Sequence, residues 1–81
     1  MSVKSPEKID VKVGQRIKVQ RQAASLTQIA LANELGVTYQ QVQKYERGVN
    51  RVGAGRLLKI AQVLGVPVGA LISGDAEAAK R

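Results

Sequence analysis

Two short helix-forming segments on either side of a glycine constrain the fold of this chain more than any other feature. Residues 28–35 and 39–47 each follow a threonine, and Gly36 comes between them. Threonine is favoured just before the first turn of a helix, and Thr38-x-x-Gln41 matches a capping box. Glycine adopts the left-handed conformation that often follows a helix without steric cost. The sequence therefore predicts two helices joined by a tight turn.

The apolar residues of these segments lie where a corner between two helices must be buried. Two helices pack at a steep angle across a short turn only if certain positions stay apolar or small. Ala32 is expected where the helices come closest. The larger side chains that we expect to be buried in this corner are Leu31, Leu35, Val37, Val42 and Tyr45.

Three further helices are predicted around this pair. The first covers about residues 11–24, with Asp10 as its N-cap and Val13, Ile17 and Ala24 on its apolar stripe. A loop over 49–55 leads to a fourth helix, and Pro67 opens a short fifth one. The apolar face of the fourth helix is expected to hold Leu57, Leu58, Ile60, Ala61 and Leu64.

The length of 81 residues allows one domain, and the composition defines its core. With two Tyr and no Phe or Trp, the core must consist of Leu, Ile, Val and Ala, which favours a compact all-α domain of five helices. We expect a flexible N-terminal arm over 1–10, the folded domain over 11–73 and a disordered tail over 74–81.

Charge and residue usage limit the classes of function. Lys and Arg total 13 against six Asp and Glu, for a net charge of +7, which favours nucleic acid or an anionic membrane surface; a merely basic protein is the alternative. The chain has no Cys and no His, so it has no thiolate or imidazole for a metal site or for catalysis. We therefore expect no enzyme activity, no cofactor and no metal. Gly53-Ala54-Gly55 lacks the Gly-Lys-Ser/Thr ending of a phosphate loop, and we interpret it as a flexible link.

Membrane and export signals are not evident. No apolar run approaches the roughly 18 residues of a membrane span, and the N-terminus lacks the apolar stretch of a signal peptide. We expect a cytoplasmic protein with no membrane partner.

The segment 28–47 and its flanks resemble the helix-turn-helix of the phage repressor and Cro-like (Xre-type) family. The resemblance is carried by Leu26-Thr27-Gln28-x-x-Leu31-Ala32, by Val42-x-x-Tyr45-Glu46-Arg47-Gly48 and by Leu57-Leu58-x-Ile60-Ala61-x-x-Leu64-Gly65-Val66-Pro67-Val68. It covers about residues 11–73 and implies a five-helix, lambda-repressor-like domain of prokaryotic or phage origin. Such a domain binds double-stranded DNA and inserts its third helix into the major groove. Val52-Gly53-Ala54-Gly55 departs from the family's usual loop, which often contains a proline.

Within the third helix, the polar side chains project away from Val42 and Tyr45. Glutamine pairs with adenine N6 and N7, and lysine donates to guanine O6 and N7. The resemblance thus implies base contacts by Tyr39, Gln40 and Lys44, with Gln41 and Gln43 as secondary candidates. An ordinary solvated helix face is the alternative, and Tyr39 is equally suited to covering the helix corner.

The resemblance also implies contacts to the DNA backbone and one structural ion pair. The candidates for backbone contact are Thr27, Gln28, Thr38, Gln43, Arg47, Asn50 and Arg51. Thr27 and Gln28 lie at the positive end of the second helix, which favours a phosphate. Arg21 and Glu46 match a family salt bridge that fixes the angle of the third helix. The alternatives are a solvated charged loop and two unrelated surface charges.

The leading hypothesis is a sequence-specific, repressor-like transcriptional regulator. One such domain makes few base contacts, so we expect a homodimer on a near-palindromic operator with half-sites about 34 Å apart. The candidate dimer surface is Val66, Val68, Leu71 and Ile72, which exceed what a small core needs. The alternative is an antitoxin-like or other protein-interaction module with the same fold. No small-molecule ligand is evident.

Overall fold

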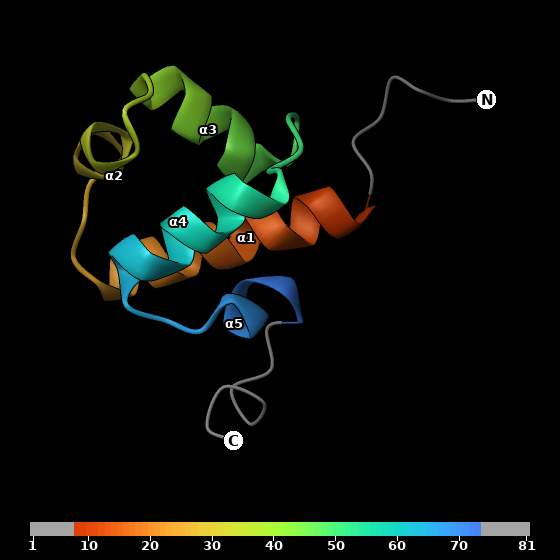
Figure 1. The fold of residues 1–81 in the computed structure, drawn as a ribbon. Coiled ribbons are helices and arrows are strands. Elements are labelled where there is room, and N and C mark those ends of the chain that lie inside the picture. Colours follow the sequence, from red (N-terminus) through yellow and green to blue (C-terminus); the bar gives the residue numbers. More distant parts are fainter. Residues whose placement is uncertain (1–7, 74–81) are drawn as a thin grey trace.

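The computed structural model describes residues 8–73, which form five helices and no strand (Figure 1). The helices are α1 (Lys8–Ala23), α2 (Gln28–Leu35), α3 (Tyr39–Arg47), α4 (Ala54–Leu64) and α5 (Val68–Ile72). The predicted all-α domain of five helices is confirmed. The predicted tail over 74–81 lies outside the described residues, as does the predicted arm except for residues 8–10, which belong to α1.

The helices meet around one apolar core. α1 lies between α3 and α5 and contacts both, and α2 packs against α3 and α4 (Figure 1). Each helix contributes one fully buried side chain to the core, and these are Ile17, Leu31, Val42, Ile60 and Leu71. None of the described helices is both long and apolar enough to cross a membrane.

The predicted ends of α1 were wrong. α1 begins at Lys8, so Asp10 lies in its first turn and is not the N-cap. The Asp10 carboxylate instead accepts hydrogen bonds from Arg51, 41 residues further along the chain. At the other end, α1 stops at Ala23 and Ala24 is exposed. Arg21 occupies the buried position that follows Val13 and Ile17 at four-residue spacing.

The prediction for α4 also needs correction. α4 begins at Ala54 with Gly53 as its N-cap, so Ala54 and Gly55 are helical and do not belong to a flexible link. Leu58 is 53% exposed, although it was expected on the apolar face. The buried face of α4 consists of Leu57, Ile60, Ala61 and Leu64.

Gly14 lies where the backbones of α1 and α3 approach each other closely. A Cβ atom at this position would lie 2.3 Å from the Tyr45 carbonyl oxygen and 2.6 Å from that of Glu46. Both oxygens belong to the backbone of α3, so they cannot move aside as a side chain does. The lack of a side chain at Gly14 therefore allows the two backbones to touch.

We expect Gly14→Ala to destabilise the fold by about 1–3 kcal/mol, because the added methyl group forces α1 and α3 apart. The measurement is the free energy of unfolding in urea. Gly55→Ala is the matched control, since a Cβ atom there meets nothing within 4 Å. That control should gain up to about 1 kcal/mol from helix propensity. Equal free energies of unfolding for Gly14→Ala and the parent chain would show that α1 and α3 are not tightly packed at Gly14.

Candidate nucleic-acid interface

The corner between α2 and α3 is fixed by caps at both ends of its turn. The Thr27 Oγ1 accepts from the Ala30 N–H at 3.0 Å, and the Thr38 Oγ1 accepts from the Gln41 N–H at 3.2 Å. Gly36 ends α2 with φ 72° and ψ 31°, the left-handed conformation that the turn requires. The N–H of the next residue, Val37, donates to the Ala32 carbonyl at 3.0 Å. This turn is the one that the sequence predicts.

The apolar side chains of the corner are buried as predicted. Val37 is partly buried, and the others have at most 9% of their surface exposed: Leu31, Ala32, Leu35, Val42 and Tyr45. The angle between the two helices is therefore held by packing as well as by the caps.

The outer face of α3 carries most of the predicted base-contact residues. Gln40, Lys44 and Arg47 are exposed and follow one another at four- and three-residue spacing, so they form one stripe along the helix. Tyr39 is 43% exposed at the start of α3. Gln41 and Gln43 are half-buried at the margins of this stripe. We call Tyr39, Gln40, Lys44 and Arg47 the α3 face.

A buried ion pair joins α1 to α3. The Arg21 Nε donates to the Glu46 Oε2 at 2.6 Å, and the Arg21 Nη2 donates to the Glu46 Oε1 at 3.2 Å. The two side chains are only 9% and 4% exposed. The Arg21 Nη1 also donates to the Leu26 carbonyl at 2.8 Å. This is the pair expected from the sequence, and it ties the end of the α3 face to the scaffold.

Two predicted DNA contacts take part in the same hydrogen-bond network. The Gln28 Nε2 donates to the Glu46 Oε1 at 3.0 Å, and the Gln43 Nε2 donates to the Gln28 Oε1 at 3.4 Å. The side chains of Gln28 and Gln43 are therefore oriented by each other and by Glu46. The sequence gives no sign of these two hydrogen bonds, which join residues 18 and 15 positions apart.

The loop after α3 is attached to the start of α1. The Arg51 Nε donates to Asp10 at 3.2 Å and 3.3 Å, and 68% of the Arg51 side chain stays exposed. The Asn50 N–H donates to the Lys44 carbonyl at 3.3 Å. Asp10 is thus a functional candidate that the sequence analysis missed, because it orients a predicted backbone contact.

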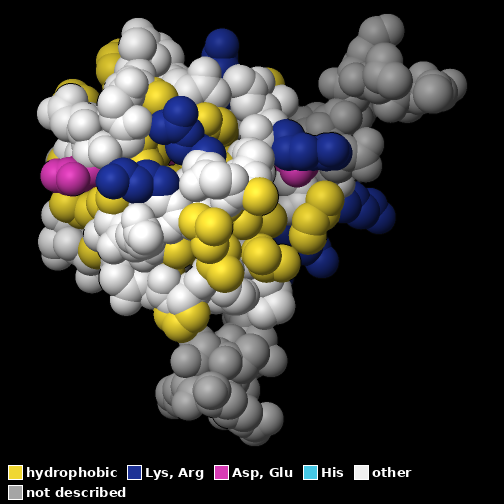
Figure 2. Space-filling model, in the orientation of Figure 1, with side chains coloured by type: hydrophobic (Ala, Val, Ile, Leu, Met, Phe, Trp, Pro, Cys, Tyr) yellow, Lys and Arg dark blue, Asp and Glu magenta, His cyan; other side chains and the backbone are white. Residues whose placement is uncertain are grey.

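The predicted dimer surface is only partly exposed. Leu71 is fully buried, so it belongs to the core and cannot contact a second chain. Val66 and Val68 are half-buried against the core, whereas Ile72 is 45% exposed. Leu58 on α4 is 53% exposed. Figure 2 shows apolar side chains gathered in the lower central part of the visible face, where Figure 1 draws α4 and α5.

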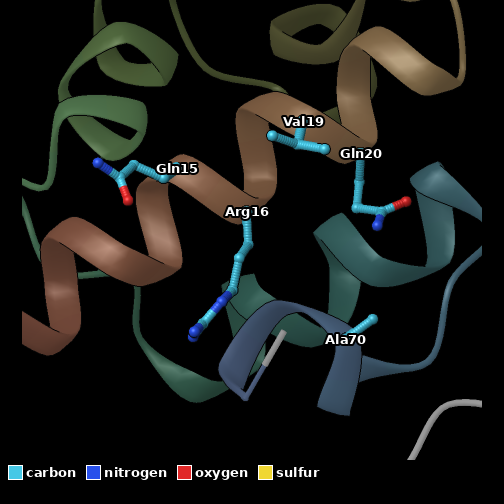
Figure 3. Close-up of a pocket in the computed structure, with 5 residues that line it drawn as sticks. All are labelled: Gln15, Arg16, Val19, Gln20 and Ala70. Carbon is cyan, nitrogen blue, oxygen red and sulfur yellow. The ribbon is translucent and has the colours of Figure 1, made fainter. Parts of the chain in front are cut away.

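A shallow cavity of about 290 Å³ lies apart from the α3 face. Its lining residues come from α1 and α5, and Figure 3 shows them: Gln15, Arg16, Val19, Gln20 and Ala70. The Arg16 guanidinium also donates to the Ile72 carbonyl at the end of α5. Since none of its described lining residues comes from α2 or α3, this cavity is not part of the corner between those two helices.

Comparison with known sequences shows one family. Residues 17–71 match the family model described as Helix-turn-helix. A relative from Sinorhizobium medicae, named an uncharacterized HTH-type transcriptional regulator, is 52% identical over 65 residues, which is 80% of this chain and 47% of the relative. The chain thus spans about half the length of this relative.

Solved structures give the same fold. The restriction-modification controller protein C.AhdI of Aeromonas hydrophila is 36% identical with a TM-score of 0.71, over 75% of this chain and 92% of that one. The P22 c2 repressor, solved with a synthetic operator, is 27% identical with a TM-score of 0.72, over 78% of this chain and 96% of that one. HppE, solved with FeII and a substrate, is 31% identical with a TM-score of 0.73, over 78% of this chain but only 37% of that one. The same fold therefore also occurs as a part, about a third, of a longer protein chain.

Proposed function

The chain belongs to the phage repressor and Cro-like (Xre-type) helix-turn-helix family, and on this basis we propose that it is a sequence-specific regulator of transcription that binds double-stranded DNA. The observation that carries the proposal is the α3 face. Its exposed polar and cationic side chains lie on a helix whose angle is fixed by a buried ion pair. Recognition helices of this kind present such side chains to base edges in the major groove.

Each residue of the α3 face has a proposed role in the complex. Gln40 pairs with an adenine, Lys44 donates to a guanine, and Tyr39 contacts a thymine methyl group or a sugar. Gln41 is a secondary base contact at the margin of the stripe. Arg47 and Gln43 lie further along α3 and contact the backbone.

The remaining proposed contacts hold the DNA backbone. Thr27, Gln28 and Thr38 lie at the N-terminal ends of α2 and α3, where the helix dipole favours a phosphate. Asn50 and Arg51 follow α3. Arg51 is exposed enough to reach a phosphate while Asp10 keeps its guanidinium in place. These contacts set the register of the protein on the duplex and carry no sequence information themselves.

We further propose a repressor-like homodimer on a near-palindromic operator. A single α3 face reads only a few base pairs, so two of them are needed for useful affinity and specificity. The exposed apolar side chains Leu58 and Ile72 are the best candidates for the dimer surface, with Val66 and Val68 at its edge.

Selection of bound sequences from a random duplex pool tests this function. We expect enrichment of an inverted repeat whose half-sites lie about 34 Å apart, one helical turn of DNA. For the selected duplex, the logarithm of the binding constant K should fall linearly with the logarithm of the salt concentration. A selected pool that stays random, or equal affinity for every duplex, would contradict the proposal.

A further inference from the structure

A small polar pocket lies beside the α3 face, where α1, α2 and α3 meet. Its volume is about 190 Å³, and its lining residues are Lys18 from α1, Gln28 from α2, and Gln43, Glu46 and Arg47 from α3. Arg47 belongs to the α3 face itself, so the pocket is continuous with the proposed DNA-binding surface.

The charges around this pocket are unbalanced. Lys18 and Arg47 are both exposed, and neither forms an ion pair with any residue in the range 8–73. Among the described residues, Glu46 is the one acidic residue in the lining. Its two oxygens accept three hydrogen bonds, two from Arg21 and one from Gln28, so its charge is already compensated. Lys18 and Arg47, which have no ion-pair partner between residues 8 and 73, therefore line a pocket whose described lining holds no free anion.

We propose that this pocket receives one backbone phosphate of the bound DNA, and that Lys18 is a DNA contact supplied by α1. The proposal rests on the proposed function, because the phosphate belongs to a duplex already held by α3. A lysine ammonium and an arginine guanidinium are suitable donors to phosphate oxygens. The pocket also lies at the N-terminal end of α2, where Gln28 begins the helix. α1 is then part of the binding surface as well as the scaffold.

The geometry of α1 provides a matched control. Gly14 marks the side of α1 that faces α3. Lys18 follows Gly14 by four residues, so it lies on nearly the same side of α1 as Gly14. Lys12 precedes Gly14 by two residues and lies roughly 160° from it around the helix axis. Both lysines are exposed, and replacing either by glutamine removes one positive charge from the same helix. Only the position of the lost charge differs.

We expect Lys18→Gln to weaken DNA binding about five- to tenfold at 0.1 M salt. The loss should be the same on the selected operator and on a random duplex, because a phosphate contact carries no sequence information. The slope of log K against log salt concentration should become shallower by about 0.9, as for one lost phosphate contact. Lys12→Gln should keep the parent slope, and both variants should keep the parent thermal midpoint.

A scan with methylphosphonates, which are uncharged in place of one phosphate, locates the contact. At one phosphate position, the substitution should weaken binding of the parent protein and of Lys12→Gln clearly more than it weakens Lys18→Gln, in which only Arg47 and the start of α2 still hold that phosphate. If Lys18→Gln and Lys12→Gln have the same slope while the parent protein still selects its operator, the pocket does not hold a phosphate and the proposed function stands. If the parent protein shows no preference among duplexes, the proposed function and this inference fall together.

Discussion

Glu46→Ala is expected to destabilise the folded chain by about 3–5 kcal/mol, because it leaves the Arg21 guanidinium buried without a counter-charge. Among the described residues, Arg21 would keep only its side-chain hydrogen bond to the Leu26 carbonyl, and the Gln28 amide would lose the Glu46 acceptor. A domain of this size is held by only about 5–15 kcal/mol in total. The measurement is the urea midpoint at low temperature, with the slope of the transition as a check on two-state unfolding.

A double variant separates the unpaired charge from the lost packing. Arg21→Met with Glu46→Leu removes both charges and fills the same space with apolar side chains. Such replacements of buried pairs are often neutral or stabilising, so we expect the double variant to recover most of the stability that Glu46→Ala loses. Glu34→Ala on α2 is the control, because Glu34 is exposed and should leave the midpoint unchanged. A Glu46→Ala midpoint equal to that of Glu34→Ala would contradict the structural role of the pair.

The parts of the fold that the sequence predicts best are those fixed by local chemistry. The structure begins α2 and α3 directly after the threonine caps, and the glycines at 36 and 48 follow their last residues. Each of these caps acts on residues within about four positions of it, so a short stretch of sequence is enough to predict it. The same holds for the α3 face, which follows from helical spacing once Val42 and Tyr45 are assigned to the core.

The parts that the sequence did not predict depend on contacts between distant residues. Asp10 lies in the first turn of α1 instead of capping it, and its carboxylate accepts hydrogen bonds from Arg51, 41 residues further along the chain. Leu71 is buried because α5 packs on α1 and α4, and the sequence of a five-residue helix does not show which side faces them. The pocket containing Lys18 exists only once α1, α2 and α3 are placed together.

The second large effect concerns recognition of DNA. Gln40 and Lys44 are exposed neighbours on one stripe of α3, and a well-formed base contact contributes about 1–3 kcal/mol of discrimination. The double variant Gln40→Ala with Lys44→Ala is therefore expected to lose about 2–6 kcal/mol of sequence preference, a fall of about 30-fold to 10⁴-fold. Its thermal midpoint should stay close to that of the parent, since both side chains lie outside the core.

A control of the same chemistry is available on another helix. Lys59 and Gln62 are exposed on α4, so Lys59→Ala with Gln62→Ala removes one lysine and one glutamine outside the α3 face. This variant is expected to keep the preference of the parent protein, although the loss of one positive charge lowers its affinity slightly for any duplex.

The measurement that tests recognition through α3 most directly is a ratio of two affinities, for the selected operator and for a scrambled duplex, at one salt concentration. We expect this ratio to be large for the parent protein and for the α4 control, and to be about 30-fold to 10⁴-fold smaller when Gln40 and Lys44 are both alanine. An unchanged ratio in that double variant would mean that the α3 face does not read the bases.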